Sequence, residues 1–229
     1  DLVEDKEARF AELAGEIDGY LAAAPDLKIE NLCALVLPHA GYRWSGATAA
    51  HGARQLRNRA IDRVVVIGPS HRAPMENMAS VPGFTHYATP LGEVPLDRKF
   101  IAELRKHAEF QEIPFVHESE HSVGVQLPLL QRVLNNFQLV PIVVGDLDRA
   151  TVRKMGRILG GLGYDAGIIG DNVFRVRPVS VTTYDSACIH MEQFGDQFGL
   201  VIFDECHHLP GEIRRDAARM AAAPMRMGL

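Results

Sequence analysis

The sequence predicts an α/β fold built on an open, mostly parallel sheet. Apolar, β-branched runs alternate with helical patterns along most of the chain. Two of these runs, residues 35–37 and 63–67, each end in a turn that carries one histidine. Such runs are typical of strands buried on both faces, and alternation of strands with helices is typical of parallel sheets. We therefore expect His39 and His71 at strand ends.

The other expected elements follow from apolar spacing and from the turns between them. Helices are expected over residues 5–21, 48–56, 97–104, 127–137, 151–162 and 186–194. Strands are expected over residues 139–144, 174–176, 179–183 and 200–203, with short strands within 75–95. Ser45 or Gly46 and, for a later helix, Asp97 are the candidate N-caps, whereas Pro128 suits a first helical turn.

A change in amino-acid composition after Gly160 predicts a domain boundary. Glycines crowd residues 160–170, so we divide the chain into a first domain, residues 1–162, and a second segment, residues 163–229. A segment of about 65 residues is marginal for an independent hydrophobic core. We therefore expect the second segment to be a partial domain.

Composition predicts a soluble, cytoplasmic protein. The 229 residues are 47% hydrophobic and 23% charged, with a formal net charge of −5, so there is no basic nucleic-acid footprint. No apolar run reaches the roughly 20 residues that span a bilayer, and no secretory leader opens the sequence, so no membrane partner is expected. Cys33, Cys188 and Cys206 lack CxxC spacing, which argues against a disulfide framework or a cysteine zinc site.

His39 and His71 are the candidate metal ligands. Neutral imidazole binds iron, copper or zinc, and open α/β sheets bind ligands beyond the carboxyl ends of their strands. His121, which lies close to Glu118 and Glu120, is a candidate third ligand, a neighbour that orients a ligand, or a proton donor. The alternative for each histidine is an ordinary hydrogen-bonded or solvated turn residue.

Five motifs in the first domain carry a family resemblance. LVLPHAGYRWSG, VVVIGPSH, YATPLGEVPLD, HESEHSVGVQLPLL and LVPIVVGD occur in this order. They resemble the Memo-like family, which in bacteria and archaea is called AmmeMemoRadiSam system protein B. The resemblance implies a fold similar to the class III extradiol dioxygenases and an iron or copper ion on His39 and His71. It also implies that His121 is an acid/base residue or lies beside a ligand.

The resemblance leaves the reaction open. It implies a small-molecule or protein partner from the radical-SAM-associated system. The family supplies a third ligand histidine from a later SSD-x-x-H segment, and this sequence holds no SSD after Gly145. Loss of a ligand weakens a metal site by several kcal/mol, so we expect a weak and open centre.

The end of the chain resembles another family. Residues 167–191 and 198–229, with the DECHHLP string, are similar to part of the RecA-like first motor domain of superfamily 2 DEAD/DEAH-box helicases, close to the XPB type. In such a site Asp204 would hold Mg²⁺, Glu205 would orient the attacking water and His207 would face the nucleic acid, which makes Mg-ATP and DNA the implied ligands. No G-x-x-x-x-G-K-[ST] motif occurs, so we expect no ATP hydrolysis by this chain alone.

The preferred hypothesis is a Memo-like metal-binding protein of unknown reaction that is fused to an incomplete helicase segment. Two modules of unrelated families joined at a glycine-rich seam indicate a fusion, genuine or introduced by gene prediction, and a fragment. The alternatives are a DNA-dependent ATPase or helicase fragment and an adaptor without catalytic activity. Metal binding separates the first hypothesis from the adaptor, and nucleotide binding separates the second from both.

Overall fold

The structure is a computed structural model that places most of the chain. It describes residues 2–29, 32, 34–163, 167–170, 173–175, 180–182, 191, 193, 200–203, 220–221 and 225–228. The chain divides into two compact units. The first comprises Asp1–Lys28 and Leu37–Leu162, and the second comprises Ile29–Val36 and Gly163–Leu229. The domain boundary expected from the sequence stays a prediction, and each unit is treated separately below.

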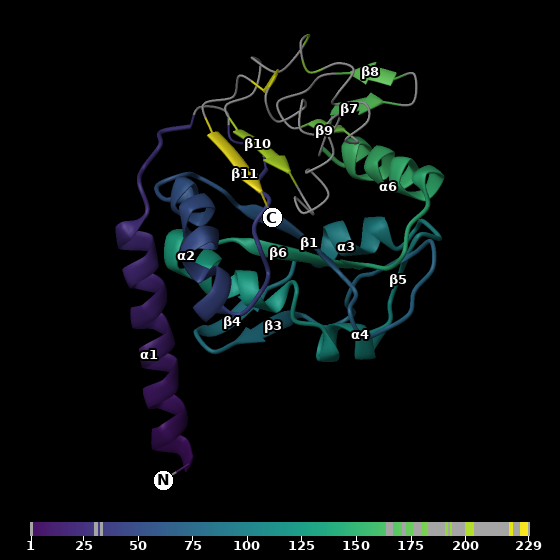
Figure 1. Cartoon of the computed structure of the whole chain (residues 1–229). Coiled ribbons are helices and arrows are strands. Elements are labelled where there is room, and N and C mark those ends of the chain that lie inside the picture. Colours follow the sequence, from purple (N-terminus) through teal and green to yellow (C-terminus); the bar gives the residue numbers. More distant parts are fainter. Residues whose placement is uncertain are drawn as a thin grey trace. The chain divides into compact units, whose positions relative to one another are not determined.

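A four-stranded sheet forms the centre of the first unit (Figure 1). Its order is β1 (Arg63–Pro69), β6 (Gln138–Val144), β2 (Ala79–Ser80) and β5 (Phe110–Gln111). β1 runs parallel to β6 and β2 runs parallel to β5, whereas β2 and β6 are antiparallel. The predicted α/β class with a mostly parallel sheet is therefore confirmed. The likeness to dioxygenases and to RecA stays a prediction.

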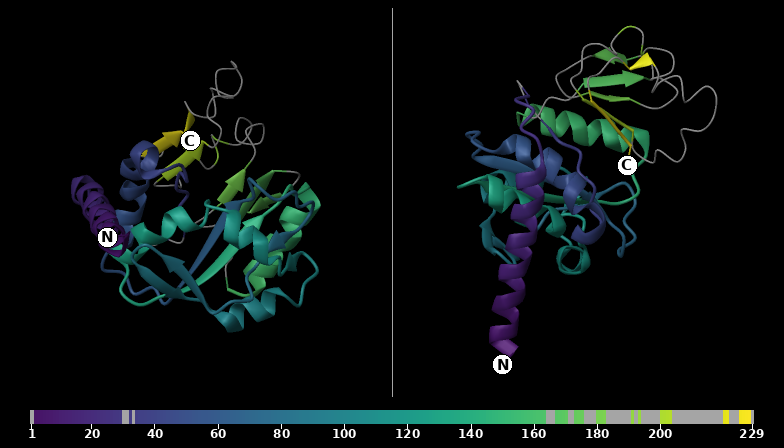
Figure 2. Two further views of the ribbon diagram at one scale, coloured as in Figure 1. Left: turned by 90° about the horizontal axis from the view of Figure 1, so that it is seen from below. Right: turned by 60° about the vertical axis from the view of Figure 1, so that its left-hand side comes forward.

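The helices of the first unit are α1 (Leu2–Ala23), α2 (Tyr42–Ala53), α3 (Arg98–Leu104), α4 (Pro114–Ser119), α5 (Leu127–Val133) and α6 (Arg149–Gly161), with short 3₁₀ turns η1 (Arg54–Leu56) and η2 (Gly124–Gln126). Three of these helices, α1, α3 and α6, begin and end within a few residues of the expected ones, whereas α2 begins six residues earlier, α5 ends four residues earlier and α4 was not expected. α1, α2 and α5 pack against one another, and Ile17 and Leu21 of α1 are fully buried there. The first turns of α1 extend past the rest of this unit (Figure 2). None of the helices within the described ranges is both long and apolar enough to cross a bilayer.

Local signals identified two helix starts correctly. The Asp97 carboxylate accepts a hydrogen bond from the Phe100 backbone N–H at 2.9 Å, so Asp97 is the N-cap of α3 as predicted. Pro128 lies in the first turn of α5, also as predicted. β2 and a hairpin of β3 (His86–Thr89) and β4 (Gly92–Pro95) account for the short strands expected within 75–95.

Three local predictions are wrong. Residues 35–37 form no strand, because none of the described strands pairs with them, so His39 precedes a helix and does not follow a strand. α2 begins at Tyr42 with Gly41 as its N-cap, because the Trp44 and Ser45 N–H groups already bind the Gly41 carbonyl. β1 is not buried on both faces: it is an edge strand of the described sheet, and Ile67 is 53% exposed.

The described part of the second unit consists mainly of strands. β7 (Gly167–Gly170) lies between β8 (Val173–Arg175) and β9 (Ser180–Thr182), and β10 (Leu200–Phe203) pairs in parallel with β11 (Met225–Gly228). The strands predicted over 174–176, 179–183 and 200–203 are confirmed to within a few residues. Most of the helix predicted over 186–194 lies outside the described residues.

Candidate metal centre

The turn after β1 places His71 at the carboxyl edge of the sheet. Ser70 fixes this turn, because its N–H donates to the Val144 carbonyl at 2.8 Å and its hydroxyl donates to the Ala73 carbonyl at 2.7 Å. The GPSH sequence thus reverses the chain beside the end of β6. His71 therefore lies where ligands bind in open α/β sheets.

Gly68 lets the loop that carries His121 approach β1 closely. A Cβ atom at Gly68 would lie 2.4 Å from the Ser122 Oγ, which is far inside van der Waals contact. The same hydroxyl donates a hydrogen bond to the Pro69 carbonyl at 2.9 Å. The absence of a side chain at Gly68 therefore brings the residues before Ser122 next to His71.

Glu120 is the buried acceptor that organises the site. Its side chain is 1% exposed, and its Oε2 accepts the His71 backbone N–H at 2.6 Å. Its Oε1 accepts the His71 Nδ1–H at 2.9 Å, the His121 N–H at 2.8 Å and the Ser122 N–H at 2.9 Å. Burial opposes ionisation, but these hydrogen bonds outweigh it and lower the pKa of Glu120 to about 2.

An ionised carboxylate fixes the tautomer of His71. A carboxylate can only accept hydrogen bonds, so the proton of a neutral His71 imidazole resides on Nδ1. The lone pair is then on Nε2, which lies 3.3 Å from the Nε2 of His39. This is the histidine–carboxylate arrangement that commonly orients metal ligands.

Three histidines from separate segments meet at this edge. The ring centroids of His39 and His71 lie 5.1 Å apart, those of His71 and His121 lie 5.0 Å apart, and those of His39 and His121 lie 6.2 Å apart. The side chains of His71 and His121 are 40% and 54% exposed, so the cluster faces solvent. Donor atoms of His71, Glu120 and His121 lie within 4.8 Å of one another, a spacing that can hold a metal ion.

The donor geometry suits two imidazoles bound to one ion. With metal–nitrogen bonds of about 2.0–2.1 Å and an angle near 105°, two Nε2 atoms are about 3.2–3.3 Å apart. The observed separation between His39 and His71 is 3.3 Å. Glu120 is less suited to bind the ion directly, because both of its oxygens already accept hydrogen bonds within the protein. We therefore assign Glu120 to the orientation of His71.

The sequence-based candidates thus divide into three groups. The structure brings His39, His71 and His121 together, although their roles stay predictions. Sequence reasoning gave Glu120 no role of its own, because the HESEHS sequence does not distinguish it from Glu118, which the structure shows to be exposed. The helicase-type candidates Asp204, Glu205 and His207 lie outside the described residues.

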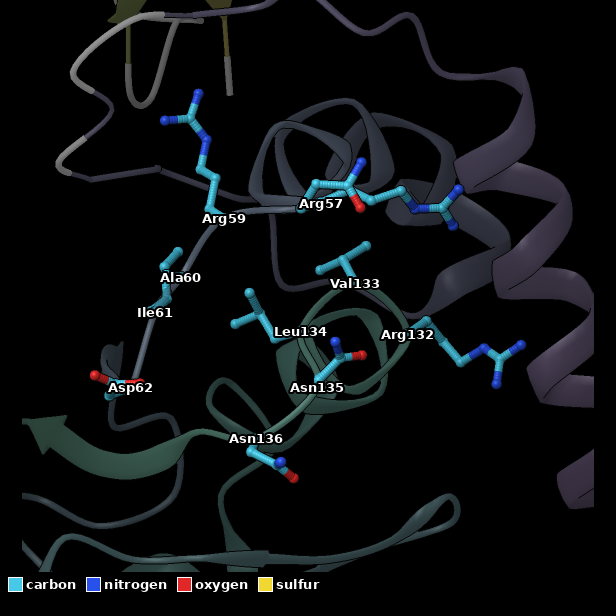
Figure 3. A pocket seen from close by; sticks show the side chains of 11 residues that line it. Arg57, Arg59, Ala60, Ile61, Asp62, Arg132, Val133, Leu134, Asn135 and Asn136 are labelled. Atoms are coloured by element: carbon cyan, nitrogen blue, oxygen red, sulfur yellow. The ribbon is translucent and has the colours of Figure 1, made fainter.

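A pocket of about 470 Å³ lies at the opposite edge of the sheet (Figure 3). Residues 57–62, which precede β1, and 132–136, at the end of α5 and before β6, line it. The side chains of Arg59 and Arg132 point away from each other and away from its centre. Arg132 is paired with Asp18 on α1. The pocket lies at the amino ends of β1 and β6, away from the histidines, and we do not associate it with them.

Comparison with known proteins decides the family. The family model described as "Memo-like protein" matches residues 7–176. The chain belongs to the Memo-like family. The five motifs on which the sequence resemblance rests all lie within that match, and so do the three clustered histidines and Glu120.

Curated relatives of this Memo-like chain come from animals and archaea. Protein MEMO1 of Danio rerio is 30% identical over 213 residues, which cover 91% of this chain and 65% of that protein. Protein memo-1 homolog of Caenorhabditis elegans is 37% identical over 134 residues, 57% of this chain and 38% of that protein. A MEMO1 family protein of Thermoplasma volcanium is 35% identical over 127 residues, 55% and 47% respectively. The chain thus spans less than two thirds of the length of these relatives.

The end of this Memo-like chain has a similarity of its own. The family model described as "Type III restriction enzyme, res subunit" matches residues 154–229 and overlaps the Memo-like match over residues 154–176. This finding confirms the predicted resemblance of the segment to a helicase family. The specific likeness to XPB-type helicases, and a bound nucleotide, stay predictions.

Proposed function

We propose that this Memo-like chain binds one iron or copper ion through the Nε2 atoms of His39 and His71. The observation that carries the proposal is the 3.3 Å separation of these two atoms, with the opposite nitrogen of His71 held by Glu120. Imidazole nitrogen is a good donor for both metals, and solvent-facing rings leave open positions for a further ligand. The ion would supply Lewis-acid or redox chemistry at those positions.

His121 is the candidate acid/base group beside the ion. Its Nδ1 lies 3.3 Å from the Glu120 Oε1, and its ring stacks on that of His71 with an interplanar angle of 27°. The side chain of His121 is more exposed than that of His71, so a substrate would be able to reach it. We propose that it exchanges protons with a ligand on the open positions of the ion.

The partner remains a proposal as well. The family resemblance supports a small molecule or a protein of the radical-SAM-associated system. The solvent-facing histidine cluster supports a ligand that approaches the carboxyl edge of the sheet.

Metal titration of the chain tests the proposal. Metal-free protein is titrated with Cu²⁺, and with Fe²⁺ under anaerobic conditions, and the bound metal is counted. We expect one ion per chain, and we expect His71→Ala to weaken its binding by at least tenfold. The control is His107→Ala, which removes an exposed histidine just after α3. Equal binding by wild type and His71→Ala would contradict the proposal.

A second candidate function is favoured by the similarity of residues 154–229 to the res subunit family. We propose that this segment binds Mg-ATP or DNA, and that it binds the nucleotide only weakly because the chain holds no phosphate-binding loop motif. ATP turnover that Glu205→Gln abolishes would support an active nucleotide site in this chain. Absence of nucleotide binding would remove this candidate without affecting the metal proposal.

A further inference from the structure

The loop that carries His39 has no secondary structure to hold it. Residues 34–40 belong to neither a helix nor a strand, and α2 begins only at Tyr42. The position of His39 against His71 therefore depends on contacts from other parts of the fold. A ligand set needs its members fixed to within about 0.5 Å, so the anchors of this loop determine whether a metal site exists.

The carbonyls on both sides of His39 are fixed by side chains. The Ala40 carbonyl accepts a hydrogen bond from the Ser45 hydroxyl at 3.0 Å, a local contact with the first turn of α2. The Pro38 carbonyl accepts one from the Gln126 Nε2 at 3.0 Å. Gln126 is 7% exposed and lies in η2, five residues beyond His121. The second contact therefore ties the His39 loop to the segment that carries His121.

Tyr42 makes a second connection between these segments. Its hydroxyl donates to the Val125 carbonyl at 2.5 Å. The N–H of the same Val125 donates to the His121 carbonyl at 2.9 Å. Tyr42 thus connects the start of α2 to Val125, a residue whose N–H is hydrogen-bonded to the carbonyl of His121. Burial raises the pKa of Tyr42, and the charge of Glu16 acts in the same direction, so the hydroxyl keeps its proton as a donor.

We propose that Tyr42 and Gln126 are positioning residues that clamp the His39 loop onto the His121 segment and thereby set the distance between His39 and His71. Neither residue is assigned as a ligand; they act through the Pro38 and Val125 carbonyls. This inference rests on the proposed function, because it names the residues that hold the nitrogens of His39 and His71 at the distance a metal ion requires. Their hydrogen bonds span 88 and 83 residues of sequence, so local folding of the loop cannot replace them.

Two variants and one control test the clamp. Tyr42→Phe removes the hydroxyl and keeps the ring, and Gln126→Leu removes the donor to Pro38. Tyr20→Phe is the control, because it removes a tyrosine hydroxyl that makes an exposed hydrogen bond to Glu16 at 2.7 Å and keeps the ring that lies beside Gly46 of α2. Circular dichroism and urea unfolding select the variants that fold. If one variant does not fold, the other still tests the proposal.

The first readout requires no metal. Nuclear Overhauser effects between the His39 and His71 rings are recorded on the metal-free proteins, since only rings held within about 5 Å of each other give them. We expect these effects in wild type and Tyr20→Phe, and we expect them to be lost or strongly weakened in Tyr42→Phe and Gln126→Leu. Unchanged effects in both folded variants would overturn the clamp.

The second readout is the affinity for Cu²⁺ by competition titration. Loss of a group that orients a ligand commonly costs about 10- to 100-fold in metal affinity, and we expect about a tenfold loss in each clamp variant and none in the control. If wild type binds neither Cu²⁺ nor Fe²⁺, the proposed function fails, and the ring contacts still decide whether Tyr42 and Gln126 act as a clamp. If copper affinity is unchanged in both variants, the clamp is overturned and the proposed function stands.

Discussion

His71 is bound to Glu120 through two separate donors. Its backbone N–H meets the Oε2 of Glu120 at 2.6 Å, and its Nδ1–H meets the Oε1 at 2.9 Å. One buried carboxylate therefore fixes both the backbone turn and the ring orientation of His71. The Nε2 atom is directed toward His39 as a consequence, so the metal proposal depends on Glu120 as much as on the histidines.

Replacement of Glu120 should damage the site more than replacement of its neighbour. Glu120→Gln keeps the shape of the side chain but removes the charge and turns one acceptor into a donor facing N–H groups. We expect metal affinity to fall by about 10- to 100-fold and the free energy of unfolding to fall by about 2–4 kcal/mol. Competition titration and urea unfolding measure the two effects. Glu118→Gln, at an exposed position, is the control, and equal behaviour of the two variants would refute the assignment.

The low pKa of Glu120 predicts a loss of stability in acid. The pKa of Glu120 is about 2 in the folded protein, against an ordinary value of 4.5 in the unfolded chain. The unfolded state therefore takes up this proton first, so the stabilising contribution is present above pH 4.5 and is lost as the pH falls toward 2. The total is about 3 kcal/mol. Urea unfolding of wild type and Glu120→Gln between pH 5 and 3 measures this effect. The difference in free energy of unfolding between the two proteins should shrink as the pH falls. A constant difference would contradict the low pKa of Glu120.

Protonation of His117 should destabilise the fold at a higher pH than protonation of Glu120 does. Burial lowers the pKa of His117 to about 4 from its ordinary value of 6.5, and the hydrogen bond with Ser80 acts in the opposite direction. The unfolded state binds the proton more tightly, so stability falls as the pH drops from 6.5 toward 4, by about 2 kcal/mol at pH 5. His117→Gln can keep a hydrogen bond to Ser80 without titrating. Unfolding at pH 7 and pH 5 should show a smaller loss in this variant than in wild type; identical losses would show that His117 is not responsible.

A methyl group at Gly68 should separate the two loops of the site. The added Cβ would lie 2.4 Å from the Ser122 Oγ and 2.9 Å from the Ser122 Cβ. We expect Gly68→Ala to lower the free energy of unfolding by about 1–3 kcal/mol and to weaken metal binding. Gly156→Ala in α6 is the matched control, because a Cβ there meets no atom within 4 Å, and it should be neutral or stabilising by up to about 1 kcal/mol. A wild-type-like Gly68→Ala variant would show that the loops adjust freely.

Elements defined by local signals could be predicted, and elements defined by distant partners could not. The run that forms β6 and the capped start of α3 contain their own information, in apolar residues and in Asp97. A strand over residues 35–37 would need a neighbouring strand, and no described strand pairs with it. Burial of β1 depends in the same way on its place at the edge of the sheet.

The candidate site shows the same division. His39, His71 and His121 stand in recognisable motifs, so the sequence could name them as candidates, and the structure brings them together while their roles stay predictions. The buried position of Glu120 arises from the packing of the loop after α4 against the end of β1, which spacing does not encode. The anchors Tyr42 and Gln126 were missed for the same reason, since both contacts join residues more than 80 positions apart.

Pulsed electron paramagnetic resonance of the Cu²⁺-loaded chain tests the central claim most directly. An imidazole bound through Nε2 gives a characteristic modulation from its remote Nδ1, and the modulation depth counts the bound rings. The account predicts at least two bound imidazoles in wild type, one fewer in His39→Ala and one fewer in His71→Ala, with no change in His107→Ala. A spectrum without imidazole modulation, or one that neither site variant changes, would contradict the account.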